Sequence, residues 1–387
     1  MTHHDHTDEA TPGSDRVPVV APPERGAAHN AQAAAEQDNG EVGTGHTGSS
    51  CCAPTGRDAF LAAPTPIALG LPPREAAAGA RHLVEQVVVP AQTFRMGDSR
   101  GDANRGDGET PVHEVTLDAF GIDATSVTND DFARFVDATG FRTEAETWGF
   151  SAVFHLAIAA PAEDVMGAPP GTPWWRGVKG ADWRHPGGRD SDIAGMGDHP
   201  VVHISWNDAQ AYCAWAGRSL PTEAQWEAAS RGGLDGARFP WGDDPHGDET
   251  TPSPTTKPRD GAPWRMNIWQ GVFPTENALE DGFLTTAPVR SFEPNPYGLW
   301  QTIGNVWEWC ADWWHPGYYG VSPLIDPRGP ERGDVRVMRG GSYLCHDSYC
   351  NRYRNAARSS NTPDSSMGNG GFRTVDRRDE VLTGVSA

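Results

Sequence analysis

The sequence contains no long apolar run. No stretch approaches the ~20 consecutive apolar residues that a membrane-spanning helix needs. The first residues are polar and acidic, and they lack the basic and then apolar order of a secretory signal. We therefore expect no membrane partner and a cytoplasmic location.

Basic residues are also scarce. Lys and Arg total 31 against 52 Asp and Glu, which gives a formal net charge of −21. A surface of this charge repels phosphate backbones, so we expect no nucleic-acid partner. A protein client with a basic residue near its reacting group fits this charge better.

Cysteine is sparse, with six residues in a chain of 387. This number is low for a disulfide scaffold of such length. Cys213 lies on the apolar side of an expected helix and Cys310 follows a Trp-Glu-Trp motif, so both are expected to pack in the core. Cys345 and Cys350 form a spaced pair, which in a reducing compartment is more often metal-binding or redox-active than structural.

Large apolar residues are almost missing from residues 1–80. This stretch also has no periodicity, so we predict a disordered polar and acidic tail. Its Cys51 and Cys52 are either reactive thiols or an inert exposed pair, and its His-rich start either binds copper(II) or nickel(II) or is plain tail. We expect the folded domain over 83–376 and a flexible C-terminus over 377–387.

Regular secondary structure is expected to be limited. Helical and strand patterns do not alternate as in βαβ units, while 45 Gly and 15 Trp are typical of a tightly turned core. We predict a compact, coil-rich single domain of the α+β class. The expected helices are 128–140, 207–216 and one that starts at Thr222, and the expected strands are 113–120 and 335–337.

The cysteine pair carries most of the recognisable chemistry. Two cysteines five residues apart converge only in a bent loop, which Gly340 and Gly341 just upstream permit. His346 and nearby arginines are expected to favour thiolates. Two thiolates suit low-coordinate copper(I) and suit structural zinc poorly. Spacing alone leaves a disulfide or two inert thiols open.

The motifs around this pair are more specific than the spacing. They are Leu-Pro-Thr-Glu-Ala-Gln-Trp at 220–226, Gly-Asn-Val-Trp-Glu-Trp at 304–309, Arg-Gly-Gly-Ser at 339–342 and Gly-Phe-Arg at 371–373. Together they resemble the formylglycine-generating enzymes, or sulfatase-modifying factors, of the prokaryotic type. The resemblance implies a C-type-lectin-like fold. It also implies an oxidase that converts the cysteine of a Cys-x-Pro-x-Arg motif in unfolded or nascent sulfatases to Cα-formylglycine, using molecular oxygen and a thiol reductant.

The same resemblance implies individual roles. Cys345 and Cys350 would hold copper(I), and the client cysteine would join them as a further thiolate. The other residues implied around the pair are Ser342, Tyr349, His346, Arg358, Trp307 and Asn369. Plainer interpretations remain open for several: core packing for Trp307 and Tyr349, a buried ion pair for Arg358, and solvent exposure for His346.

Structural calcium is a further implication of the resemblance. One site would use Asn267, the Ile268 carbonyl, Asp281 and the Phe283 carbonyl, all of them oxygen donors. A second would use the carbonyls of Gly304 and Val306 and the side chain of Glu308. The chain departs from the family at Gln301, where relatives often carry Asn, and at Phe150, where some carry Asp near the groove for the client's arginine.

Two other functions compete with the oxidase. The shared motifs also fit a non-catalytic protein-binding module of the same superfamily. An iron-dependent oxidase on this fold would need an added helical domain with a His-x3-His-x-Glu motif, and the sequence has none.

Overall fold

A computed structural model describes residue 60 and residues 82–104, 106–246 and 263–377 of the chain. All of them belong to one unit, residues 47–387. The predicted tail, including Cys51 and Cys52, lies outside the described residues except for Phe60. The ring of the half-buried Phe60 lies 6.2 Å from that of Phe150.

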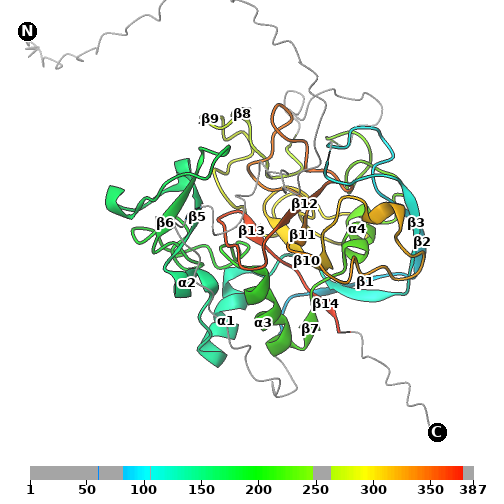
Figure 1. Ribbon diagram of the computed structural model, residues 1–387, viewed down its shortest axis with the longest axis horizontal. Helices are drawn as coiled ribbons and strands as arrows, with labels where there is room; N and C mark the ends of the chain where they lie inside the picture. The colour runs from blue at the N-terminus through cyan, green and yellow to red at the C-terminus, as the bar shows by residue number, and fades with distance from the viewer. Residues whose placement is uncertain (1–59, 61–81, 105, 247–262, 378–387) are drawn as a thin grey trace, which may run out of the picture. The chain divides into compact units, whose positions relative to one another are not determined.

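Two four-stranded sheets organise the domain (Figure 1). The first sheet has the order β1 (Gln86–Val89), β4 (Phe120–Asp123), β14 (Val375–Asp376) and β7 (Arg218–Ser219), with antiparallel neighbours. The second has the order β12 (Arg358–Asn361), β11 (Arg336–Arg339), β10 (Trp307–Trp313) and β13 (Gly370–Gly371). Only the β10–β13 pair in it is parallel, with Trp307 opposite Gly370.

The remaining described strands form antiparallel pairs. These are β2 (Gln92–Met96) with β3 (His113–Leu117), β5 (Phe150–Phe154) with β6 (Trp175–Lys179), and β8 (Gly271–Val272) with β9 (Glu276–Asn277). The strand predicted over 113–120 is therefore two strands, β3 and β4, which belong to different sheets. Strand β5 gave no alternating signal because all five of its residues are buried.

Side-chain caps define the α-helices of the described chain. They are α1 (Asn129–Thr139), α2 (Glu144–Trp148), α3 (Trp206–Ala216) and α4 (Glu223–Arg231), with short 3₁₀ turns at His155–Ala157, Ala162–Asp164 and Tyr318–Gly320. Each α-helix starts at a Ser or Thr capping box and ends at a left-handed glycine, which satisfies both helix ends. The three predicted helices are confirmed, whereas α2 was not predicted.

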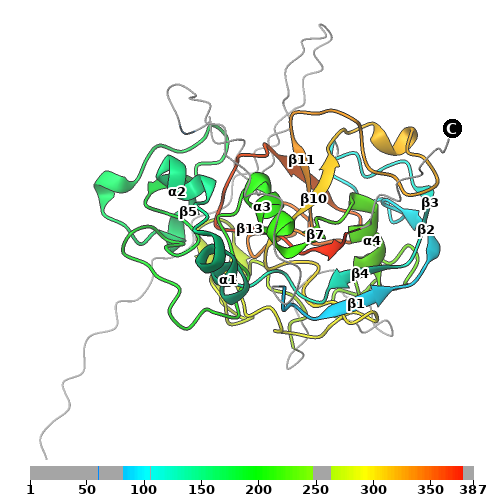
Figure 2. The ribbon, with the colours of Figure 1, turned by 90° about the horizontal axis from the view of Figure 1, so that it is seen from below.

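Tryptophan fills much of the core. Six Trp side chains are less than 2 % exposed, and Cys213 and Cys310 are buried as predicted. Helix α4 packs on β10 and β11, while α1 lies beside α3 (Figure 2). The predicted coil-rich α+β fold is confirmed. In the part of the chain that the structure describes, no helix is both long and apolar enough to cross a membrane.

Candidate active site

Cys345 and Cys350 are brought into one tight loop. Neither cysteine is in a disulfide, and the residues are 0 % and 3 % exposed. The Cys345 N–H donates to the Ser342 carbonyl at 2.9 Å, and the Cys350 N–H donates to the His346 carbonyl at 2.7 Å. These two bonds bend the chain twice within a few residues. The predicted bent loop is therefore confirmed, and the predicted alternative of a disulfide is not what the structure shows.

The two glycines before the loop are required by close contacts. Gly340 and Gly341 have φ values of 94° and 75°, which disfavour any other residue. A Cβ atom on Gly341 would lie 2.6 Å from the Arg352 carbonyl oxygen and 3.1 Å from the Cys345 sulfur. A side chain at this position would therefore push directly on the cysteine.

Ser342, Asn369 and Trp307 meet on one side of the loop. Asn369 Nδ2 donates to Ser342 Oγ at 2.9 Å, and the backbone N–H of Trp307 donates to the backbone carbonyl of Asn369 at 2.8 Å. All three residues are buried. The backbone N–H of Ser342 also donates to the Cys345 sulfur at 3.4 Å, and such a donor stabilises negative charge on that sulfur. The parallel β10–β13 pairing is what delivers Asn369 to this position.

Tyr349 and His346 lie at the more exposed side of the loop. The half-buried Tyr349 stacks on Phe273 with ring centroids 4.4 Å apart and meets Trp174 edge-on at 5.1 Å. His346 Nδ1 bonds to Ser348 Oγ at 2.7 Å. Phe273 and Trp174 were not predicted, because they are far from the cysteines in sequence and carry no motif of their own.

Arg358 has the buried ion pair that was one of its two interpretations. Its Nε and Nη2 atoms donate to both carboxylate oxygens of Glu223 at 2.6 and 2.9 Å, and the residue is 0 % exposed. Arg339, which immediately precedes Gly340, donates to the same Glu223 at 2.8 Å. Arg358 is thus linked to the cysteine loop through Glu223 and Arg339.

The predicted positive surroundings of the thiols are largely neutralised. Arg352 pairs with Asp107, Arg354 with Glu109 and Arg358 with Glu223. Each guanidinium donates two hydrogen bonds to the carboxylate of its partner, and the carboxylate offsets the positive charge. Sequence reasoning saw the nearby arginines and missed the acids, which come from distant segments.

The first calcium set has unsatisfied oxygens. Asn267 Oδ1 and Asp281 Oδ2 are buried without a hydrogen-bond partner among the described residues. Burial raises the pKa of Asp281 to about 6, although the Phe283 N–H donates to its other oxygen at 3.0 Å. Buried oxygens that lack donors fit a hard cation well. The carbonyls of Ile268 and Phe283 would complete an all-oxygen set, although Gln270 Nε2 already donates to the Ile268 carbonyl.

The second calcium set does not fit. Both carboxylate oxygens of Glu308 already accept two hydrogen bonds each. The donors are Arg373 Nε and Nη2, Trp226 Nε1 and Ser126 Oγ, at 2.7–2.9 Å. A cation that joined the Gly304 and Val306 carbonyls would have to displace this buried ion pair. The expectation for Glu308 is therefore replaced by a structural role, because Arg373 supplies the positive charge.

The fold of this domain is shared with a solved structure. The structure of PvdO from Pseudomonas aeruginosa shares the fold, with a TM-score of 0.52 and 23% identity over 77% of this chain and 99% of that chain. Residues 73–378 match the family model described as "Sulfatase-modifying factor enzyme 1-like domain".

Proteins with similar sequences identify the family to which the chain belongs. The chain is 58% identical to "Formylglycine-generating enzyme" of Streptomyces coelicolor, covering 84% of this chain and 99% of the relative. It is 41% identical to "Inactive C-alpha-formylglycine-generating enzyme 2" of Mus musculus, covering 74% and 84%. The chain belongs to the formylglycine-generating enzyme family, as the sequence motifs predicted.

Proposed function

We propose that this protein oxidises the cysteine of a Cys-x-Pro-x-Arg motif in unfolded or nascent sulfatases to Cα-formylglycine. The carrying observation is the bent loop that holds two buried cysteines outside any disulfide, Cys345 and Cys350, beside the Ser342–Asn369 hydrogen bond. The name of the relative with 58% identity supports the same reaction. None of the four described cysteines is in a disulfide, which supports a reducing compartment such as the cytoplasm.

Copper(I) is the proposed cofactor, held by the two loop thiolates. Soft sulfur donors suit copper(I). Bound copper would supply the one-electron chemistry needed to use molecular oxygen. The client cysteine would provide the further thiolate.

The reaction balances with one molecule of oxygen and two thiols of a reductant. The CH2–SH group of the client becomes CHO, its sulfur leaves as hydrogen sulfide, and the second oxygen atom leaves as water. The two reductant thiols become a disulfide, which supplies the remaining two electrons.

The protein residues would position and shield these groups. Buried Ser342, Asn369 and Trp307 would form the oxygen side of the site, where the Ser342 hydroxyl is fixed by Asn369 Nδ2. Tyr349, stacked on Phe273, would shield the opposite, more exposed side. One calcium ion, held by the Asn267 and Asp281 set, would stabilise the segment that precedes the site.

Mass spectrometry of a Cys-x-Pro-x-Arg peptide tests the proposal. The peptide is incubated with copper-loaded protein, oxygen and a thiol reductant, and the mass loss from CH2–SH to CHO is measured. We expect conversion by the wild type, none by Cys345→Ser or Cys350→Ser, and full conversion by Cys213→Ala. Cys213 is a matched control because it is another buried free thiol. Full activity of either loop variant would disprove the assignment.

A protein-binding module is the second candidate function. A relative named as inactive shares 41% identity with this chain, so the fold alone does not require turnover. A folded, copper-loaded protein that binds the peptide but leaves its mass unchanged would favour this candidate.

A further inference from the structure

Phe60 packs at a defined place on the β5–β6 hairpin. Its ring meets that of Phe150 at an interplanar angle of 66°, and a Cβ atom on Gly177 would lie 3.0 Å from Phe60 Cδ1. Gly177 stands opposite Ala152 across the hairpin, so this pair of small residues leaves room for an aromatic ring. Phe60 is half-buried and packs against the core cluster that contains both loop cysteines.

The hairpin connects this contact with the cysteine loop. Trp174 lies three residues before Gly177, which corresponds to about 10 Å of extended chain. The Trp174 ring meets the Tyr349 ring at 5.1 Å, and Tyr349 directly precedes Cys350. The contact of Phe60 with the hairpin is therefore a short distance from the more exposed side of the loop.

The sequence just before Phe60 is similar to the motif of the proposed client. Residues 52–57 read Cys-Ala-Pro-Thr-Gly-Arg. The cysteine and the proline have the same spacing as in Cys-x-Pro-x-Arg, and the arginine comes one residue later. Residues 52–57 lie outside the described residues, and the likeness is one of sequence. A motif of this kind, joined to a residue that packs near the loop, is a candidate ligand of the loop.

Cys52 is within reach of the loop from Phe60. It lies eight residues before Phe60, and an extended chain of that length spans up to about 26 Å. This span is longer than the path along the hairpin from Gly177 to the Tyr349 ring. A group tethered at this range has an effective concentration on the order of millimolar. Weak contacts are therefore enough for the segment to compete with a free client.

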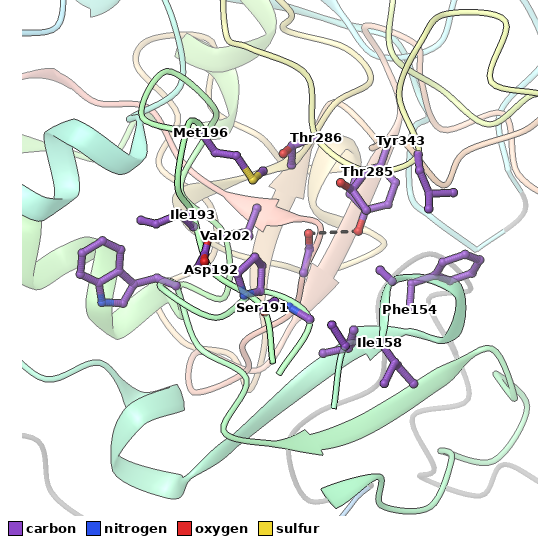
Figure 3. Close-up of a pocket in the computed structure, with 18 of the residues that line it drawn as sticks. Phe154, Ile158, Ser191, Asp192, Ile193, Met196, Val202, Thr285, Thr286 and Tyr343 are labelled. Atoms are coloured by element: carbon purple, nitrogen blue, oxygen red, sulfur yellow. Dashed lines mark hydrogen bonds between the residues drawn. The ribbon is translucent and has the colours of Figure 1, made fainter. Parts of the chain in front are cut away.

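A cavity of about 400 Å³ is separate from the Phe60 contact. Ile158 lines it, and Tyr343 is the one lining residue from the 342–350 segment (Figure 3). Among the described residues that line this cavity, neither Phe60 nor either loop cysteine occurs. A substitution at Ile158 is therefore a control for a substitution at Phe60.

We propose that residues 52–57 occupy the client-binding face of the cysteine loop and compete with the client. Phe60 anchors the segment on the hairpin, and the Cys52 thiol takes the place of the client cysteine beside Cys345 and Cys350. The client displaces the segment before it reacts. This inference rests on the proposed function, because the motif that the segment imitates is that of the proposed client.

Steady-state kinetics on the Cys-x-Pro-x-Arg peptide measures the competition. Cys52→Ser and Phe60→Ala should each lower KM at least about threefold, because each weakens a tethered competitor. Both should leave kcat unchanged. Cys51→Ser, outside the motif, and Ile158→Ala, in the separate cavity, should keep the wild-type KM. If the wild type converts the peptide, an unchanged KM in Cys52→Ser or Phe60→Ala would overturn the inference and leave the proposed function standing.

Disulfide mapping tests the same contact without turnover. Two metal-free double variants, Cys51→Ser with Cys345→Ser and Cys51→Ser with Cys350→Ser, each keep Cys52 and one loop cysteine. The dilute protein is oxidised with diamide, digested and analysed by mass spectrometry. We expect a bridge within one chain from Cys52 to the remaining loop cysteine in at least one variant. Adding Phe60→Ala should lower the yield of this bridge, whereas adding Ile158→Ala should not.

The mapping also separates this inference from the proposed function. Absence of the bridge from both variants, each shown by thermal unfolding to be folded, would overturn the inference whatever the activity. A bridge in the variants of a chain whose wild type leaves the client peptide unchanged would support the docking of the segment and refute the oxidase.

Discussion

Asn369 Nδ2 lies 2.9 Å from Ser342 Oγ and donates a hydrogen bond to it, joining the C-terminal part of the domain to the cysteine loop. Both residues are fully buried, so water does not replace this bond. The Ser342 hydroxyl therefore has one fixed orientation beside Cys345. This relationship gives the first of four predictions.

Ser342→Ala and Asn369→Ala should each lower kcat/KM for the client peptide about tenfold, which is about 1.4 kcal/mol of transition-state stabilisation. The double variant should lose less than the product of the two effects, since both changes remove the same bond. Steady-state kinetics on the four proteins measures the coupling. Thr93→Ala, which removes the exposed Thr93–Thr116 hydroxyl bond, should leave kcat/KM unchanged. Strictly additive effects would show that the bond plays no part in turnover.

Glu223→Gln should destabilise the domain by about 3–5 kcal/mol, because it leaves Arg358 buried beside a neutral partner, whereas Arg339 keeps its ion pair with Glu227. Urea unfolding at pH 7 measures this change. Glu163→Gln is the control, because its ion pair with Arg189 is exposed and should contribute below about 1 kcal/mol. The activity on the client peptide, measured at each urea concentration, should follow the folded fraction. A fully folded variant without activity would instead give Arg358 a direct catalytic role.

The buried His203 should make stability depend on pH. Burial lowers its pKa to about 4 from 6.5, while its ring bonds to Ser151 Oγ at 2.7 Å and to the Pro186 carbonyl at 2.9 Å. The unfolded chain therefore binds a proton that the folded chain does not between these values. This contribution is fully present above pH 6.5 and is lost as the pH falls toward 4, with a slope of up to about 1.4 kcal/mol per pH unit.

His203→Asn should flatten that pH dependence. Asn tolerates the left-handed φ of 59° at this position and does not titrate. Chemical unfolding of wild type and variant from pH 4 to pH 7 gives the difference in slope. His315→Asn, at an exposed histidine, should keep the wild-type slope. Identical slopes for wild type and His203→Asn would contradict the prediction.

Calcium should bind at one site and not at two. The oxygens of Asn267 and Asp281 are unsatisfied, whereas Glu308 is saturated by Arg373 and its neighbours. Equilibrium dialysis should give one calcium ion per chain, and chelation should lower Tm. Asp281→Asn should abolish both effects, whereas Glu280→Gln at the exposed neighbour should keep them. A stoichiometry of two would restore the Glu308 site.

Local signals predicted the helices well and the long-range pairs poorly. Thr128 with Gly140, and Thr222 with Gln225, are cap signals that a short stretch of sequence contains in full. Helix α2 has the same signals in Thr143 and Glu146, but it is only five residues long and shows no apolar periodicity. Strand β5 is buried throughout, so it shows no alternation either.

In the candidate site, too, local features could be predicted from the sequence and long-range contacts could not. The loop at Cys345 and Cys350 follows from adjacent residues, and its bend required the two preceding glycines. The partners of Arg358 and Glu308 depend on tertiary contacts with Glu223 and Arg373, which no local pattern specifies. Both residues were assigned to ligand or catalytic surroundings by resemblance, and the structure shows each of them in a buried ion pair.

The parallel pairing of β10 with β13 also has a consequence for biosynthesis. Trp307 emerges from the ribosome well before Gly370, its partner across the strands. A growing chain that already displays Cys345 and Cys350 still lacks Asn369, so its thiols stand unsupported by the finished pocket. A chain truncated in this interval would therefore contain both cysteines but lack the hydrogen bond that orients the Ser342 hydroxyl.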